Sequence, residues 1–237
     1  MVEETGCPAL AGRRAVIISN GQVRDVSYFA SFIRPSDYVI AVDGGLKQAQ
    51  CLGARVDMLL GDFDSLPEEE VLQLAHAGVR VMRYPPEKDQ TDTHLALEYA
   101  VRSGASEVIM LSALGGRLDH TLANLWLLPV YHSTRCPVTI VGDDNTVHLV
   151  KDEISMQGRP GEYVSLLPVT PEVRGITTSG LRYPLVNGTL RWGESLGISN
   201  EFLKEQARVT LTSGMLFVIR VNPDRYPPRS PAGPGRE

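Results

Sequence analysis

The sequence predicts an α/β N-terminal domain with a mostly parallel sheet, followed by a C-terminal antiparallel β-sandwich or barrel domain. From Arg14 to about Asp144, short β-branched runs alternate with helical stretches, as in a parallel sheet covered on both faces. After about Asn145 the helical pattern nearly disappears, and short apolar runs are separated by Gly and Pro. We therefore expect domains over residues 1–144 and 145–222, with a disordered Pro-, Gly- and Arg-rich tail over 223–237.

Runs of Val, Ile, Leu and Met mark the strands of the first half, and Gly or Pro marks the helix ends. The expected strands are residues 15–18, 38–42, 58–60, 79–84, 108–111 and 138–141. The expected helices are residues 26–33, 46–52, 68–77, 91–103 and 119–131. Pro35 stops the first of these helices, while Gly53 and Gly78 close the next two.

The second half is expected to contain strands over residues 146–150, 163–167, 174–179, 209–212 and 216–221. Only residues 200–205 have the composition of a short helical turn. This half therefore carries almost no helix.

The composition is that of an ordinary globular protein, with 43% hydrophobic and 22% charged residues and a net charge of −5. No block of Lys and Arg is present, which argues against a nucleic-acid partner. The start lacks signal-peptide character and no apolar run approaches the ~20 residues of a membrane span, so we expect a cytoplasmic protein with no membrane partner. Cys7, Cys51 and Cys136 are expected to be reduced, non-nucleophilic thiols.

The clearest chemical motif is Gly61-Asp62-Phe63-Asp64-Ser65, which directly follows the apolar run 58–60. Two residues apart on a strand, Asp62 and Asp64 point to the same side, where their charges repel unless a cation lies between them. A hard divalent ion with oxygen ligands, most simply Mg²⁺ carrying a phosphate, suits such a pair. The alternative, that both aspartates only cap the following helix, stays open.

Polar segments follow four other strands of the predicted sheet. They are Asn20-Gly21, Asp43-Gly44-Gly45, Lys88-Asp89-Gln90-Thr91-Asp92 and Gly115-Gly116-Arg117-Leu118-Asp119-His120. Ligands of parallel sheets bind beyond the carboxyl ends of the strands, so we expect all five segments to converge. Each segment alone also reads as a turn, a helix cap or a plain loop. Their joint placement favours a phosphate site, although the chain has neither a P-loop nor a dinucleotide fingerprint.

In their order along the chain, these motifs resemble those of the thiamine pyrophosphokinase (thiamine diphosphokinase) family. The second half adds Thr178-Ser179-Gly180-Leu181-Arg182-Tyr183-Pro184-Leu185 and Gly193-Glu194-Ser195-Leu196-Gly197-Ile198-Ser199-Asn200, which are similar to that family's thiamine-side motifs. The resemblance spans about residues 17–221. It implies an ATP-binding catalytic α/β domain, a thiamine-binding β domain and a homodimer with active sites between subunits. The implied reaction moves the terminal diphosphate of ATP onto thiamine and releases AMP.

The resemblance also implies roles for individual residues. Catalytic residues would be Asp62, Asp64, Asp92 and Asp119, and the Mg²⁺ ligands would be Asp62, Asp64 and Asp92. The ATP site would comprise Asn20, Asp43, Gly44, Gly45, Lys88, Asp89, Gln90, Thr91, Gly116, Arg117 and His120. Thiamine would be contacted by Tyr183, Ser199 and Asn200. Three alternatives stay open for the proton of the attacking hydroxyl: Asp92 accepts it, Asp119 accepts it, or it leaves without a dedicated base.

Two other functions fit part of the pattern. A metal-dependent phosphohydrolase could use the same aspartates to activate water, but the five histidines are scattered rather than clustered. A non-catalytic nucleotide or thiamine sensor would be expected to lack one or more of the aspartates, and all are present.

Overall fold

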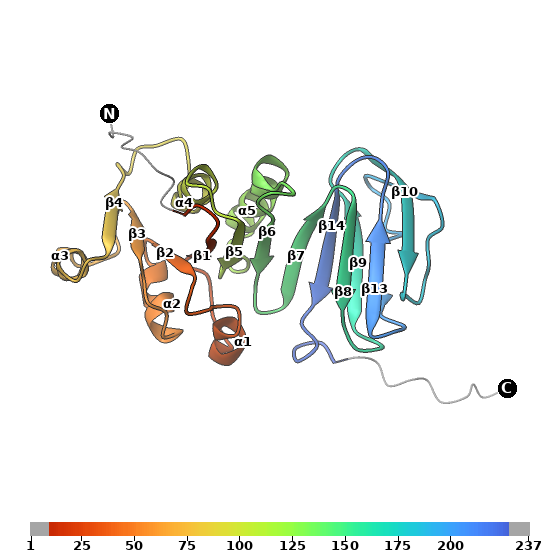
Figure 1. Ribbon diagram of the computed structural model, residues 1–237, viewed down its shortest axis with the longest axis horizontal. Coiled ribbons are helices and arrows are strands. Elements are labelled where there is room, and N and C mark those ends of the chain that lie inside the picture. Colours follow the sequence, from red (N-terminus) through yellow and green to blue (C-terminus); the bar gives the residue numbers. More distant parts are fainter. Residues whose placement is uncertain (1–9, 228–237) are drawn as a thin grey trace. The chain divides into compact units, whose positions relative to one another are not determined.

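The computed structural model describes residues 10–227 and divides the chain into two compact units, one ending at Asp143 and one beginning at Asp144 (Figure 1). Cys7 and the 228–237 part of the expected tail lie outside the described residues. Among the described residues, no helix combines the length and the apolar character that crossing a membrane requires.

The first unit is a six-stranded parallel sheet with helices between the strands. Its strands are β1 (Arg14–Ile18), β2 (Tyr38–Val42), β3 (Met58–Gly61), β4 (Arg80–Arg83), β5 (Glu107–Leu111) and β6 (Val138–Val141). Its helices are α1 (Val26–Ala30), α2 (Gly45–Cys51), α3 (Glu68–His76), α4 (Asp92–Arg102) and α5 (Leu118–Tyr131). The strand order is β6-β5-β1-β2-β3-β4, and every adjacent pair is parallel. The direction of winding therefore reverses between β1 and β5, where sheets of this kind bind ligands.

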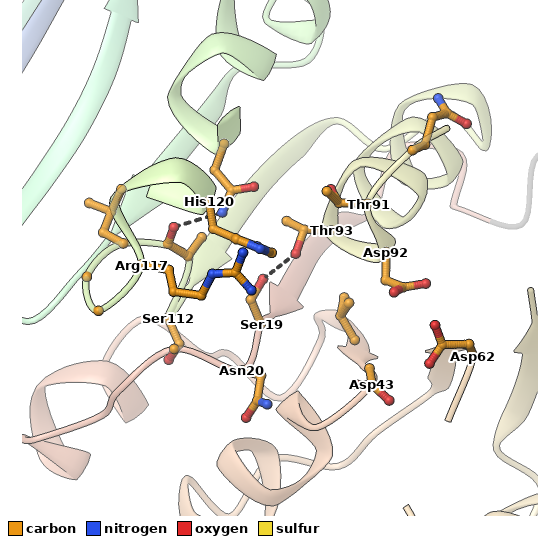
Figure 2. A pocket seen from close by; sticks show the side chains of 18 of the residues that line it. Ser19, Asn20, Asp43, Asp62, Thr91, Asp92, Thr93, Ser112, Arg117 and His120 are labelled. Carbon is orange, nitrogen blue, oxygen red and sulfur yellow. Dashed lines mark hydrogen bonds between the residues drawn. The ribbon is translucent and has the colours of Figure 1, made fainter. Parts of the chain in front are cut away.

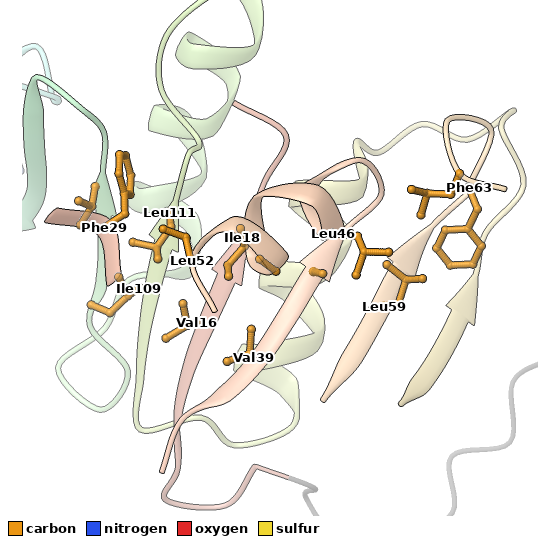
Figure 3. Packing of buried hydrophobic residues seen from close by; sticks show 14 of the residues in the cluster. Val16, Ile18, Phe29, Val39, Leu46, Leu52, Leu59, Phe63, Ile109 and Leu111 are labelled. Atoms are coloured by element: carbon orange, nitrogen blue, oxygen red, sulfur yellow. The ribbon is translucent and has the colours of Figure 1, made fainter. Parts of the chain in front are cut away.

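Helices cover both faces of this sheet, with α1 and α2 on one side and α4 and α5 on the other (Figure 1). Alternate residues of one strand face opposite sides. Val16 and Ile18 pack with Phe29 of α1 and Leu46 of α2, and all four are almost completely buried (Figure 3). Burial on both faces explains why the central strands are continuously apolar rather than alternating.

Helix α1 is shorter than the sequence predicts, because it ends at Ala30 instead of continuing to residue 33. Asp25 caps its start by accepting a hydrogen bond from the backbone N–H of Tyr28 at 2.9 Å. Beyond the helix, Phe32 N–H and Ile33 N–H bond to carbonyls three residues back, which makes tight turns before Pro35. The other helices of this unit lie within one residue of their predicted bounds at each end.

The second unit contains two antiparallel sheets, which confirms the predicted fold class. Its strands are β7 (Asn145–Val150), β8 (Glu153–Gln157), β9 (Tyr163–Pro168), β10 (Glu172–Ser179), β11 (Gly188–Arg191), β12 (Asn200–Glu201), β13 (Gln206–Thr210) and β14 (Leu216–Val221). One sheet has the order β12-β9-β14-β7, and the other has the order β11-β10-β13-β8. A common core that includes Val164, Ile176, Phe202 and Val218 lies between them.

The short helical turn expected over residues 200–205 is wrong. Asn200 and Glu201 instead form β12, which pairs with β9, and Phe202 forms a bridge with Leu181. Long-range pairing overrides local propensity here, as is common for short strands. The sequence reading also missed β8 and β11, each only four or five residues long.

Candidate active site

The five polar segments predicted to converge line one cavity of about 800 Å³ beyond the carboxyl ends of the parallel strands (Figure 2). The predicted residues that line it are Asn20, Asp43, Asp62, Asp64, Lys88, Asp89, Gln90, Thr91, Asp92, Gly116, Arg117 and His120. Gly44, Gly45 and Asp119 are not among its lining residues. The cavity includes residues that follow both β1 and β5, so it lies at the switch point of the sheet.

Three aspartates at this edge are close enough to share one cation. One carboxylate oxygen from each of Asp43, Asp62 and Asp64 lies within 4.8 Å of the others. Within residues 10–227, the side chain of Asp43 accepts hydrogen bonds from the hydroxyl of Ser65 alone, at 3.2 and 3.3 Å. Three convergent carboxylates suit a hard divalent ion such as Mg²⁺. This set shares Asp62 and Asp64 with the expected ligands and adds Asp43, and the expected metal role of Asp92 stays a prediction.

Asp92 instead forms an ion-pair chain with Lys88 and Asp62. Lys88 Nζ lies 3.2 Å from an oxygen of each carboxylate, and all three side chains are mostly buried. Burial acts to raise the pKa of Asp62, but hydrogen bonds from the Asp64 backbone N–H and from Lys88 outweigh it and lower the pKa. Burial also raises the pKa of Asp92, and there Lys88 offsets it only in part. The two carboxylates are therefore electrostatically distinct, with Asp92 the more basic.

Two buried oxygens lack a hydrogen-bonding partner within the described part of the chain: Oδ1 of Asp92 and Oγ of Ser112. The Asp92 oxygen is paired with Lys88 Nζ, 3.2 Å away, which leaves Ser112 Oγ as the buried oxygen with no polar partner among residues 10–227. Both residues line the cavity. Buried polar groups without partners are costly, and in native proteins they commonly bond a ligand, water or ion. The Ser112 hydroxyl is therefore available to a polar ligand in the cavity.

Three residues just beyond the strands that border the cavity have strained backbone conformations. Asp43, Phe63 and Ser112 have positive φ angles of 45°, 65° and 55°, although none is glycine. Such conformations cost about 1–3 kcal/mol each and cluster at functional sites. Gly45 is needed for a different reason, because a Cβ there would lie 2.2 Å from the backbone oxygen of Ile18. The loops are therefore shaped by close backbone approach and not by helix capping alone.

Arg117 and Asp119 form an exposed pair at the start of α5. The guanidinium donates to both carboxylate oxygens, at 2.6 and 3.2 Å. This contact lowers the pKa of Asp119 to about 2. Such an acidic carboxylate is a poor proton acceptor, and it does not line the cavity.

Sequence reasoning missed several cavity residues, of which Ser19, Thr93 and Asn124 are the most informative. The hydroxyls of Ser19 and Thr93 lie 3.1 Å apart and join the end of β1 to α4 (Figure 2). Asn124 is buried and donates to the Ala113 carbonyl at 2.8 Å, which ties α5 to the loop after β5. A lone Asn within the apolar run 122–128 was the available signal.

A second cavity of about 400 Å³ lies within the second unit. Tyr183 and Ser199 line it, as do Asn145, Tyr163, Ser165, Glu201, Val221 and Tyr226, which sequence reasoning did not select. The expected residue Asn200 does not line it. Asn200 is buried, and its amide accepts from Tyr183 N–H at 3.0 Å and donates to Tyr183 C=O at 2.7 Å. It therefore holds the tyrosine backbone in place.

The chain combines an antiparallel β unit with a parallel sheet that has glycine turns and convergent carboxylates at its switch point. These features together define a class of α/β proteins that bind phosphorylated ligands. Residues 29–140 match the family model "Thiamin pyrophosphokinase, catalytic domain", and residues 146–216 match "Thiamin pyrophosphokinase, vitamin B1 binding domain". The chain is 30% identical to a thiamine pyrophosphokinase of Bacillus subtilis over 76% of this chain and 86% of that protein. The chain belongs to the thiamine pyrophosphokinase family.

Further relatives extend the comparison. Thiamine pyrophosphokinase 1 of rice is 28% identical over 69% of this chain and 65% of its own length. A crystal structure of the Bacillus subtilis enzyme has a TM-score of 0.79 at 26% identity, covering 89% of this chain and 99% of that one. A thiamin pyrophosphokinase structure from Geobacillus thermodenitrificans has a TM-score of 0.75 at 31% identity, covering 88% and 97%.

Proposed function

We propose that this protein is a thiamine diphosphokinase, which transfers the terminal diphosphate of ATP to thiamine and gives thiamine diphosphate and AMP. Family membership supports the reaction, and the first cavity supplies the chemistry. The observation that carries the proposal is the grouping of three carboxylates with Lys88 and the unpartnered Ser112 hydroxyl in one cavity. A triphosphate with a bound cation would satisfy these groups.

In this proposal Asp43, Asp62 and Asp64 hold Mg²⁺, which when bound neutralises charge on the phosphates. Lys88 and Arg117 contribute positive charge to the diphosphate as it moves. For Arg117 this requires exchanging its bond to Asp119 for phosphate oxygens. Gly115 and Gly116, which line the cavity, let backbone N–H groups approach the nucleotide.

The reaction forms a bond between the hydroxyethyl oxygen of thiamine and the β-phosphorus of ATP. The bond from that phosphorus to the oxygen bridging the α-phosphate breaks, and AMP leaves with the oxygen. The hydroxyl proton must go to a base. We assign it to Asp92, whose raised pKa and position in the cavity suit a proton acceptor better than the exposed, strongly acidic Asp119.

The second cavity is the proposed thiamine side of the protein. Tyr163, Tyr183 and Tyr226 provide aromatic faces, which attract organic cations such as the thiazolium ring. Glu201 adds a carboxylate that Arg182 holds at 2.6 Å. Asn200 contributes by fixing the backbone of Tyr183 and not by touching the ligand.

A homodimer is proposed as well, with helix α5 at the contact. Its exposed apolar side chains recur at every fourth position, at Leu118, Leu122, Trp126 and Val130, and are between 45% and 72% exposed. An exposed apolar stripe of this kind is typical of an interaction surface. Leu122→Glu combined with Val130→Glu should give monomers in analytical ultracentrifugation, whereas Leu72→Glu, at an equally exposed leucine of α3, should leave the dimer intact. Wild-type protein that sediments as a monomer would refute the dimer.

The test of the reaction is an assay of purified protein with ATP, Mg²⁺ and thiamine that separates AMP from ADP. Thiamine-dependent AMP together with thiamine diphosphate is the expected result. ADP with thiamine monophosphate would change the reaction to single phosphoryl transfer. Thiamine-independent release of phosphate would favour the hydrolase, and ligand binding without turnover would favour a sensor. Within residues 10–227, the group of side chains that could hold a metal is Asp43, Asp62 and Asp64. It contains no histidine, which counts against the hydrolase.

A further inference from the structure

The second cavity lies on the outer face of the sheet β12-β9-β14-β7. Tyr163 and Ser165 of β9 line it, whereas Val164 between them packs into the core of the second unit. Successive residues of a strand point to opposite faces, so the floor of the cavity is the face turned away from the core. Glu201 of β12 pairs directly with Tyr163 of β9 and adds a carboxylate to this floor.

Two tyrosines from neighbouring loops also line the cavity. Tyr183 follows β10 and Tyr226 follows β14, and they are 60% and 52% exposed. No Lys, Arg or His of residues 10–227 lines the cavity. The lining carboxylate of Glu201 is already paired with Arg182 at 2.6 Å, so the aromatic faces are the groups left to attract a cationic ring.

A hydrogen-bonded turn after β14 sets the position of Tyr226. Asn222 is buried, and its backbone N–H donates to the Asp144 carbonyl at 2.8 Å. Its side-chain Oδ1 accepts from the backbone N–H of Asp224 at 3.1 Å. Its own carbonyl accepts from the N–H groups of Arg225 and Tyr226, at 3.1 and 2.9 Å. One buried asparagine therefore anchors the turn through both its side chain and its backbone.

Proline on either side of the turn makes it a property of the local sequence. Pro223 fixes its own φ, and the pair Asn222-Pro223 is typical of turn initiation. Pro227 disfavours a helical conformation of Tyr226, so the turn ends there. The backbone that carries the tyrosine is therefore ordered before a ligand binds, which lowers the entropic cost of the contact. The match to the vitamin B1 binding model ends at residue 216, so family membership assigns this turn no role.

We propose that Tyr226 is a specificity-determining residue, which makes the second cavity favour a positively charged heterocyclic ring over a neutral one, and that Asn222 positions it. This inference rests on the proposed function, which places the thiazolium ring of thiamine in this cavity. The face of a tyrosine ring attracts a cation through its quadrupole, whereas a neutral ring of the same shape gains only from burial. Tyr226 therefore distinguishes the two by charge and not by size.

The experiment measures kcat/KM for thiamine and for its neutral counterpart, in which a thiophene ring replaces the thiazolium. The two compounds have nearly the same shape, so the ratio of their kcat/KM values reports the preference for the charge. Tyr226→Ala removes the aromatic face, and Tyr226→Phe keeps the face without the hydroxyl. Arg225→Ala is the matched control, because Arg225 belongs to the same turn and is exposed but does not line the cavity.

Tyr226→Ala should lower the preference for thiamine by about 2- to 5-fold, the worth of one exposed cation–π contact. The loss should come through the KM for thiamine, because the contact is the same in the ground state and the transition state, while kcat and the KM for ATP stay nearly unchanged. Tyr226→Phe and Arg225→Ala should keep the wild-type preference. Asn222→Ala should reproduce the loss on its own and have no further effect on the preference in a Tyr226→Ala background.

An unchanged preference in Tyr226→Ala would overturn the proposal, and so would an equal loss in Arg225→Ala. A loss in Asn222→Ala that is just as large when Tyr226 is already replaced would overturn the positioning role. A wild type that forms no thiamine diphosphate would refute the proposed function separately. Calorimetric binding of the two compounds then decides the inference: thiamine binding that is tighter in wild type and weakened by Tyr226→Ala supports it, and any other result overturns it.

Discussion

Asp43→Asn tests whether the residue that the structure adds to the acidic cluster is a true metal ligand. The change keeps the shape of the side chain and removes one negative charge from the group of three carboxylates. The Asp43 carboxylate accepts a hydrogen bond from the Ser65 hydroxyl. Losing this hydrogen bond should lower the free energy of unfolding by only about 0.5–1.5 kcal/mol. The fold should therefore survive while the cation site loses a third of its charge.

We expect kcat/KM to fall by about 10²- to 10³-fold, which corresponds to about 2.7–4 kcal/mol of transition-state stabilisation. The Mg²⁺ concentration at half-maximal rate should rise at the same time, because a ligand to the ion is weakened. Initial rates of AMP release, measured across a Mg²⁺ titration, give both quantities. Ser65→Ala is the matched control, since it removes the same hydrogen bond and leaves the charge.

Comparing Asp43→Asn with Asp92→Asn decides which third aspartate binds the metal beside Asp62 and Asp64. If Asp43→Asn kept wild-type rates and an unchanged Mg²⁺ requirement while Asp92→Asn abolished turnover, the set expected from sequence would stand. The cluster of Asp43 with Asp62 and Asp64 would then be a coincidence of two strand ends. Equal losses in Asp43→Asn and Ser65→Ala would also refute the reasoning, because geometry and not charge would matter.

Three further predictions follow from the second cavity and from the core. Tyr183→Ala should raise the KM for thiamine more than the KM for ATP, and the reverse would place thiamine elsewhere. Deleting everything after Pro227 should leave activity unchanged, whereas deletion after Asp224 also removes Tyr226 and should raise the thiamine KM in the same assay. Asp37→Ala should lower the free energy of unfolding by about 3–5 kcal/mol in urea denaturation, because it leaves the largely buried Arg14 unpaired. A loss below about 1 kcal/mol would mean that this pair behaves as a surface ion pair.

The sequence predicted the parallel strands well because their signal is local. Five residues of continuous apolar character, such as Tyr38–Val42, read as a buried strand without any knowledge of neighbours. The short strands of the second unit carried less information. Asn200 and Glu201 are a strand only because β9 lies beside them, so no local pattern could reveal it. The cytoplasmic location and the disorder expected over residues 223–237 stay predictions, although the N–H groups of Arg225 and Tyr226 donate to the Asn222 carbonyl at 3.1 and 2.9 Å.

The location of the site could be predicted from the sequence, but the contacts between its side chains could not. Strand-end reasoning brought Asp62 and Lys88 to one cavity, because topology alone decides which loops meet. It did not show that Lys88 would form ion pairs with both Asp62 and Asp92. It also did not show that the buried amide of Asn200 would bond the backbone of Tyr183, and the expected contact of Asn200 with thiamine stays a prediction. Partner choice among polar groups depends on side-chain reach and burial, which the order of residues does not give.

The position of Asp43 illustrates how such a contact arises. Its φ of 45° turns the chain sharply after β2, and its backbone N–H is held 2.9 Å from the Leu60 carbonyl of the neighbouring strand. Gly61 lies against it, and a Cβ at Gly61 would come within 3.0 Å of the Asp43 Cβ. A glycine directly before Asp62 thus lets the ends of β2 and β3 approach each other. The glycine of the motif, which carries no chemistry itself, brings the carboxylates of two strands within reach of one ion.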